Sequence, residues 1–207
     1  MESYRPFIDD PAYLPRLDRQ RFVVLRAPEP VASAYEQVRN ALRHRLDGQP
    51  VSFPARPHVT LCGFSAGTDL GSVQELVRAW APQVGELPIE IERVSVFPSP
   101  FQIVIVEVRR APALHAALAD LRARATAANL AVSTVMAVEN WTFHMSAAYC
   151  GQLSAEPWRE LTEFVRTLRV PQAAAMVGSA DIVAFDEGRE YSGGMIPLTA
   201  SSIRTKR

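Results

Sequence analysis

Hydrophobic positions along the chain follow two different spacings, and the changes between them predict its secondary structure. Short β-branched or alternating runs predict strands at 21–27, 58–64, 87–97, 101–110 and 141–150, and a strand hairpin at 178–199 that turns at DEGR. Apolar residues at three- and four-residue steps predict helices at 31–46, 69–84, 111–130 and 156–170. The apolar stripe of the first helix consists of Val31, Tyr35, Val38, Leu42 and Leu46.

The predicted elements run through the same series twice. Each half reads as strand, helix, histidine-bearing strand, helix and strand, and the opening strands lie near Phe22 and Gln102. This layout predicts an approximate internal duplication. No linker composition separates the halves, so we expect one bilobal α+β domain over residues 21–199. A surface segment at 1–20 precedes it, and a short basic tail at 200–207 follows it.

The histidine-bearing strands contain RPHVTLCGF (56–64) and WTFHMSAAYC (141–150). In a strand, residues i and i+2 point to the same face, about 7 Å apart. His58 therefore shares a face with Thr60, and His144 shares a face with Ser146. The residues between them are apolar and suit a core. Each strand is predicted to offer an imidazole and a hydroxyl on one face and an apolar surface on the other.

Two facing histidines suit acid–base chemistry on a phosphoester, because imidazole titrates near neutral pH. One neutral histidine can take a proton from water while the other, charged, gives a proton to the departing sugar oxygen. The near-symmetry of the motifs does not say which histidine is the base. The hydroxyls of Thr60 and Ser146 would donate hydrogen bonds to the non-bridging phosphate oxygens. This scheme needs no metal and no cofactor.

Composition restricts the expected size of the substrate and the expected location of the protein in the cell. The 207 residues are 48% hydrophobic and carry 22 basic and 22 acidic side chains, so the formal net charge is zero. Proteins that track long nucleic acids usually carry a basic surplus, so we expect a short nucleotide or an RNA end instead. The chain has no apolar run of about 18 residues and no signal-like start, which predicts a soluble, cytoplasmic protein without membrane contact. We expect a monomer. Two cysteines do not make a disulfide framework.

The sequences His58-Val59-Thr60-Leu61 and His144-Met145-Ser146-Ala147 resemble the paired H-x-[T/S] motifs of the 2H phosphoesterase superfamily, which includes 2′–5′ RNA ligase-like proteins and cyclic phosphodiesterases. The resemblance covers about residues 21–199. It implies a fold in which two pseudo-symmetric lobes of antiparallel sheet plus helices surround a central cleft. It also implies metal-independent hydrolysis, or reversible ligation, at 2′,3′-cyclic or 2′–5′ phosphate linkages. By this likeness His58 and His144 are the catalytic pair, and Thr60 and Ser146 bind phosphate.

The chain departs from that pattern after the motifs. Many relatives carry a basic residue there, whereas these places hold Cys62, Ala148, Tyr149 and Cys150. Phosphate charge must then be balanced by Arg56, by an arginine from elsewhere, or by the histidines. Strand parity places Arg56 and Phe64 on the face of His58, which makes them candidate substrate-binding residues, and it places Tyr149 on the core side.

Other readings of the same residues stay open. Parity also places Cys62 and Cys150 on the histidine faces, but Cys62 lies about 13 Å along a regular strand from His58. One zinc ion or a Cys–His nucleophile could not use both, so buried free thiols are favoured. His44 and His115 fall in helices and suit surface or packing roles. The same groove could serve a non-catalytic nucleotide or RNA-end binding module, or both motif histidines could be structural.

Overall fold

Two four-stranded sheets form the frame of the protein. The computed structural model describes residues 18–54, 56–133, 137–186 and 189–198, so most of the predicted N-terminal segment and the basic tail lie outside the described residues. The first sheet has the order β2 (His58–Phe64), β1 (Arg21–Arg26), β7 (Ser179–Asp186) and β8 (Arg189–Pro197). The second has the order β5 (His144–Tyr149), β4 (Ile103–Val108), β3 (Leu87–Phe97) and β6 (Ala174–Val177). All neighbouring strands pair antiparallel.

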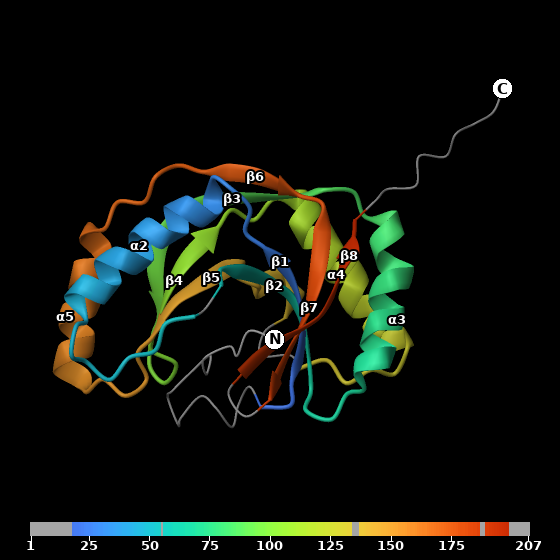
Figure 1. Ribbon diagram of the computed structural model, residues 1–207, viewed down its shortest axis with the longest axis horizontal. Coiled ribbons are helices and arrows are strands. Elements are labelled where there is room, and N and C mark those ends of the chain that lie inside the picture. Colours follow the sequence, from blue (N-terminus) through green and yellow to red (C-terminus); the bar gives the residue numbers. More distant parts are fainter. Residues whose placement is uncertain (1–17, 55, 134–136, 187–188, 199–207) are drawn as a thin grey trace.

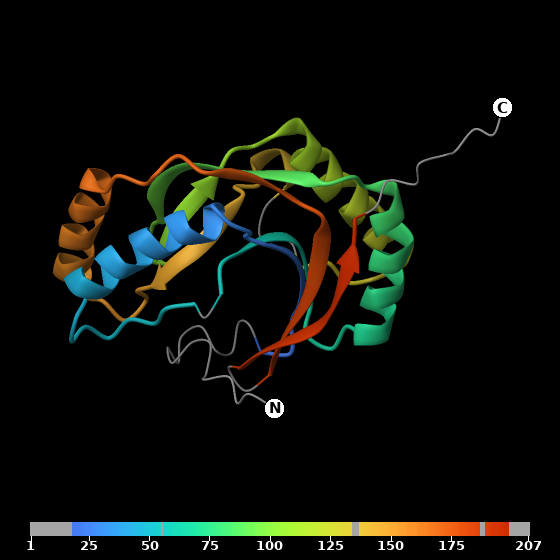
Figure 2. The same cartoon turned by 45° about the horizontal axis from the view of Figure 1, so that its top comes forward.

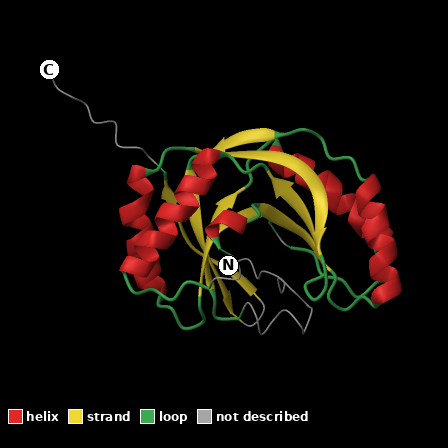
Figure 3. Cartoon of the chain, turned by 180° about the vertical axis from the view of Figure 1, so that it is seen from behind, coloured by secondary structure: helices red, strands yellow, loops and turns green. Residues whose placement is uncertain are grey.

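The α-helices of the described residues lie as two pairs at opposite ends of the molecule (Figures 1 and 3). One pair comprises α2 (Val31–Arg45) and α5 (Ala155–Thr167), and the other comprises α3 (Leu70–Trp80) and α4 (Pro112–Ala127). Short 3-10 turns follow at Ala81–Gln83 and Val138–Asn140. Helix α3 begins where the carboxylate of Asp69 accepts a hydrogen bond from the backbone N–H of Ser72 at 2.8 Å. It becomes a 3-10 turn at Pro82, which cannot donate a backbone hydrogen bond.

The predicted α+β class with two antiparallel sheets is confirmed, but each sheet combines strands from both halves of the chain. Strand β3, from the first half, lies in the sheet of β4 and β5. Strands β7 and β8, from the second half, complete the sheet of β1 and β2. Strand β6 was not predicted, because four residues of sequence AAMV give no clear alternation. It leads through Gly178 directly into β7, so this stretch crosses from one sheet to the other (Figure 2).

A single large apolar cluster joins the two sheets and the four helices. The predicted stripe of α2 is buried in it: Val31, Tyr35, Val38, Leu42 and Leu46 are each at most 5% exposed. The apolar side chains of the motif strands, such as Val59 and Met145, lie in the same cluster. The main core therefore lies on one face of the motif strands, and their polar residues lie on the other.

Tyr35 ties helix α2 to the second motif strand. Its side chain is fully buried, and its hydroxyl donates a hydrogen bond to the backbone carbonyl oxygen of Ser146 at 2.8 Å. The helix from the first half thus holds the backbone of the second histidine motif in place.

Replacing Tyr35 with phenylalanine removes this partly buried hydrogen bond and leaves the Ser146 carbonyl without that donor. We expect Tyr35→Phe to lower the free energy of unfolding by about 1 kcal/mol, measured by urea denaturation. Tyr191→Phe, at a tyrosine that is 46% exposed, is the matched control and should stay within about 0.5 kcal/mol of the wild type. Equal unfolding midpoints for the two variants would show that the Tyr35 hydroxyl does not stabilise the fold.

Candidate active site

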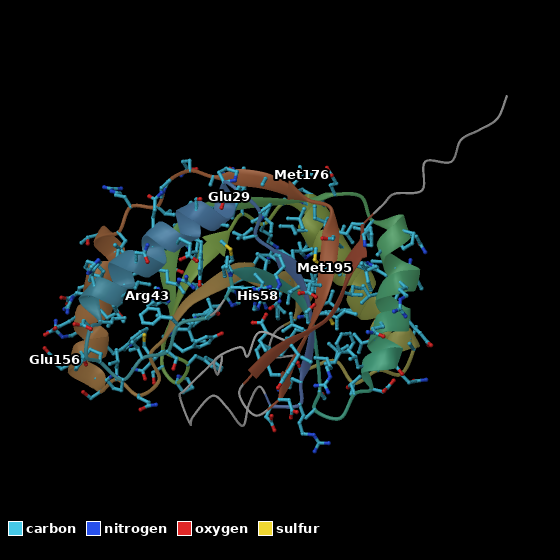
Figure 4. All side chains as sticks on the ribbon, in the orientation of Figure 1. Glu29, Arg43, His58, Glu156, Met176 and Met195 are labelled. Atoms are coloured by element: carbon cyan, nitrogen blue, oxygen red, sulfur yellow. The ribbon has the colours of Figure 1, made fainter. Side chains whose placement is uncertain are left out.

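The two motif strands lie side by side at the edges of their sheets. Strand β2 is the outer strand of the first sheet, β5 is the outer strand of the second, and the two strands contact each other. His58 is the first residue of β2 and His144 is the first residue of β5. Figure 4 labels His58 near the middle of the molecule, where β2 and β5 meet. The contact between edge strands brings the two motifs to one region.

Both motif strands carry a β-bulge at the same place. In β2, Thr60 pairs with Val24 and Cys62 with Val23, so Leu61 is an extra residue. In β5, Ser146 pairs with Ile105 and Ala148 with Val104, so Ala147 is extra. Each bulge follows its motif hydroxyl directly, at the third residue after the histidine. The predicted duplication therefore extends to a local irregularity of the backbone.

A bulge shifts every later residue of its strand to the opposite face. The expectation that Phe64 shares the face of His58 is wrong for this reason. Phe64 is fully buried in the main core, so its side chain cannot meet a substrate at His58. Tyr149 changes in the opposite sense: it was predicted to face the main core but lies in a separate apolar cluster.

That second cluster shows how the polar faces of the two sheets are arranged. We call the face of each sheet that carries its histidine and hydroxyl the motif face. Val24 pairs with Thr60, so it lies on the motif face of the first sheet. In the second sheet, Ile105 pairs with Ser146, and Ile103 lies two residues away on the same face of β4. Tyr149 pairs with Ile103 and therefore lies on the motif face as well. Val24 and Tyr149 belong to one buried cluster. The two motif faces therefore meet.

The cysteines also lie on the core side, contrary to the parity argument. Cys62 and Cys150 are free, fully buried and part of the main core. Burial raises the pKa of the Cys62 thiol to about 12, so this thiol remains protonated and poorly nucleophilic. Among the described residues, no group of three or more His, Cys, Asp or Glu is placed to hold a metal ion.

His58 is partly buried beside an arginine that the sequence reasoning missed. Nη1 of Arg26 lies 3.5 Å from Nδ1 of His58, and the two residues are ladder partners on β1 and β2. Burial lowers the pKa of His58 to about 3, and the charges of Arg26 and His144 lower it as well, whereas a hydrogen bond to the backbone of Arg56 raises it. The effect of His144 means that the two imidazoles are close enough to interact electrostatically.

His144 has a different partner at the equivalent ladder position. It pairs with Glu107 of β4, and its Nδ1–H donates to the carbonyl oxygen of Thr142 at 2.8 Å. Burial lowers the pKa of His144, and the hydrogen bond to Thr142 and the charge of Glu107 oppose this. The ring of Phe97 meets the imidazole edge-on, with centroids 4.8 Å apart. The Nδ1–H bond leaves Nε2 as the nitrogen that can exchange a proton with a substrate.

The remaining predicted residues occupy different surroundings. Thr60 and Ser146 are partly exposed and lie on the motif faces, two residues after their histidines. Arg56 is exposed and lies just before the motif strand, so its contact with phosphate stays a prediction. His44 is exposed near the end of α2, and His115 lies partly buried in α4, as expected for helix positions.

Arg26 and Glu107 could have been found from the sequence only with the strand register. Each is the residue opposite a motif histidine in an antiparallel ladder. The runs RFVVLRA and FQIVIVEVRR show the charges but not their partners. Long-range pairing is what makes them part of the site.

The family assignment follows from a comparison with known proteins. The model of the 2′–5′ RNA ligase superfamily matches residues 16–189. The chain belongs to this superfamily. The resemblance to 2H phosphoesterases is thereby confirmed, and membership supports an enzyme of phosphoester chemistry in general terms. No curated protein matches the chain.

Solved structures of the superfamily fold are similar in shape but distant in sequence. TT0787 of Thermus thermophilus has a TM-score of 0.65 at 15% identity, covering 88% of this chain and 99% of its own. E. coli LigT complexed with ATP has a TM-score of 0.59 at 15% identity, with coverage of 87% and 98%. Usb1 of Kluyveromyces marxianus has a TM-score of 0.50 at 12% identity, with coverage of 89% and 100%. These likenesses support the fold. In the described part of this superfamily member, no helix has the length and apolarity needed to cross a bilayer.

The lowered pKa of His58 predicts how stability depends on pH. A histidine in the unfolded chain has a pKa of about 6.5, so between pH 6.5 and 3 the unfolded state binds more protons at this position than the folded state. The contribution of His58 to the free energy of unfolding is therefore fully present above pH 6.5 and decreases as the pH falls towards 3. We expect His58→Asn to flatten the fall in unfolding free energy between pH 6.5 and 4.5, by up to about 1.4 kcal/mol per pH unit. Parallel pH curves for the variant and the wild type, measured by urea denaturation, would contradict this.

Proposed function

We propose that the protein is a metal-independent phosphoesterase that acts on 2′,3′-cyclic phosphate or 2′–5′ linkages of nucleotides or RNA ends. The observation that carries the proposal is the pair of histidine motifs on two contacting edge strands, whose imidazoles interact electrostatically. Strand alternation gives each strand an imidazole and a hydroxyl on its motif face, and the contact of Val24 with Tyr149 in one buried cluster supports the meeting of these two faces. A phosphate held there would have one proton acceptor, one proton donor and two hydroxyl donors around it.

The reaction on a cyclic phosphate needs one water molecule and two proton transfers. One neutral imidazole takes a proton from water as the water oxygen bonds to phosphorus. The bond from phosphorus to one ribose oxygen breaks, and that oxygen takes a proton from the second, charged imidazole. The product is a phosphomonoester beside a free hydroxyl. If the 5′-hydroxyl of a second RNA end takes the place of water, the same two proton transfers form its bond to phosphorus and release the ribose 3′ oxygen as a hydroxyl. The product is then a 2′–5′ phosphodiester, which is ligation.

The substrate class is supported by the charge balance and by the structural relatives. The formal net charge of the chain is zero, which suits a short nucleotide or a chain end better than a long polyanion. Crystal structures of E. coli LigT with ATP, 3′-AMP and NADP+ show that a protein of this fold can hold nucleotides. We extend this ligand class to the present chain.

The decisive experiment is hydrolysis of a panel of 2′,3′-cyclic nucleotides and of short RNAs with cyclic or 2′–5′ linked ends, in the presence of EDTA. We expect turnover by the wild type. His58→Ala and His144→Ala should each reduce kcat by about 10² to 10⁴, because each removes one proton-transfer group. His44→Ala, at an exposed helix position, is the matched control and should keep wild-type turnover.

Two other outcomes would redirect the proposal. Wild-type-like turnover by either motif variant would sink the two-histidine mechanism. Nucleotide binding without turnover on any substrate would identify the alternative, a non-catalytic nucleotide or RNA-end binding module at the same site.

The hydroxyl pair generates a separate prediction. If Thr60 and Ser146 donate to non-bridging oxygens whose charge grows in the transition state, Thr60→Val and Ser146→Ala should each lower kcat by about a hundredfold. Their unfolding midpoints should stay close to that of the wild type, since both side chains are partly exposed. A rise in KM at constant kcat would instead assign these hydroxyls to ground-state binding.

A further inference from the structure

The two histidines are equivalent in sequence but lie beside opposite charges. Their ladder partners occupy the same place in each sheet, and one partner is Arg26 while the other is Glu107. Both imidazoles also bond to the backbone two residues earlier, His144 at Thr142 and His58 at Arg56. The two rings therefore have equivalent backbone hydrogen bonds, and they differ in the charge of the neighbouring side chain.

Arg26 is fixed in its position beside His58. Its Nε donates to Asp181 at 2.9 Å, and its Nη2 contacts Asp181 at 2.8 Å and Glu190 at 2.5 Å. Both carboxylate side chains are nearly buried, at 4% and 8% exposure. The remaining nitrogen, Nη1, is the one that lies nearest to the imidazole. His58 therefore meets an N–H edge of a cation, which disfavours a second positive charge on the ring.

Glu107 is held in turn beside His144. Its carboxylate accepts hydrogen bonds from Nε and Nη2 of Arg93 at 3.0 and 3.2 Å and from the hydroxyl of Ser95. The side chain of Arg93 is 67% exposed, so solvent weakens its charge, whereas that of Glu107 is only 14% exposed. The carboxylate therefore remains the charge that His144 experiences most directly.

We propose that these charges divide the acid–base roles: Arg26 keeps His58 neutral as the general base, and Glu107 favours the protonated form of His144, the general acid. Arg26 and Glu107 are then positioning residues that act through the histidines. The inference rests on the proposed function for its chemical roles, although the protonation order itself does not. In the hydrolysis described above, His58 would take the proton from water, and His144 would protonate the ribose oxygen that leaves.

The other charged groups near the pair do not reverse this order. Asp181 and Glu190, on β7 and β8, together exceed the charge of Arg26, but they bind its Nε and Nη2 and so lie beyond the guanidinium as seen from His58. Between the two rings the repulsion is mutual, so it disfavours protonation of both at once and leaves the order to Arg26 and Glu107. On β3, Arg93 is paired with Glu107 and exposed. Arg56, before β2, is exposed as well.

The test is placed on Glu107, because removing Arg26 would leave two nearly buried carboxylates without their cation. NMR titration of labelled imidazoles reads both histidines without any turnover. We expect His144 to take up a proton at higher pH than His58 in the wild type. Glu107→Gln should lower the titration midpoint of His144 by about one pH unit and leave that of His58 nearly unchanged. Glu90→Gln, which breaks a comparable ion pair with Arg109 at 3.0 Å, is the matched control.

Kinetics give the second readout. If His144 is the general acid, Glu107→Gln leaves less of it protonated, so kcat on a 2′,3′-cyclic nucleotide at pH 7.5 should fall by up to about tenfold, matching a one-unit shift. A rise in kcat would overturn the assignment, because it would mean that neutral His144 is the base. A titration order with His58 above His144 would overturn it as well. Correct titration without turnover by the wild type would remove the proposed function while leaving the protonation order standing.

Discussion

The antiparallel ladders that pair β2 with β1 and β5 with β4 determine the orientation and the neighbours of the motif residues. They set which face each imidazole occupies, and they choose the residue that lies opposite it. After Thr60 and Ser146, a bulge in each strand moves the later residues to the opposite face. Only the histidine and the hydroxyl residue of each motif therefore keep the positions that strand alternation predicts. An apolar residue can then follow the motif without breaking the core, as Phe64 and Ala148 do.

The exchange of strands between the two halves makes a single body from a duplicated pattern. Neither sheet is complete in one half of the chain, since β3 joins the second sheet and β7 and β8 join the first. Helix α2 likewise crosses over to the second sheet, where Tyr35 bonds to the backbone of Ser146. The relative position of His58 and His144 is therefore set by many contacts between the halves and not by a hinge.

Much of the fold could be predicted from the sequence, because an element with one buried face repeats its apolar residues at the period of a helix or a strand. The stripe of α2 and the alternation around His58 and His144 both follow from one apolar face. The strand exchange left no such mark, since it depends on pairing between distant segments. The bulges at Leu61 and Ala147 were also invisible, because the residues that follow each of them suit either face of a strand. The hidden bulges explain why Phe64 and Tyr149 were assigned to the wrong faces. The unknown strand pairing explains why Arg26 and Glu107 were missed.

The place of β7 has a consequence for the order of assembly during synthesis. The first sheet contains β1, near the N-terminus, but its third strand begins only at Ser179. While a ribosome is still translating the middle of the message, β1 has an open edge, and Arg26 has neither of its carboxylates. The nascent chain must keep that edge from pairing elsewhere until almost the whole polypeptide has emerged. The surroundings of His58 are thus among the last parts of the molecule to be completed.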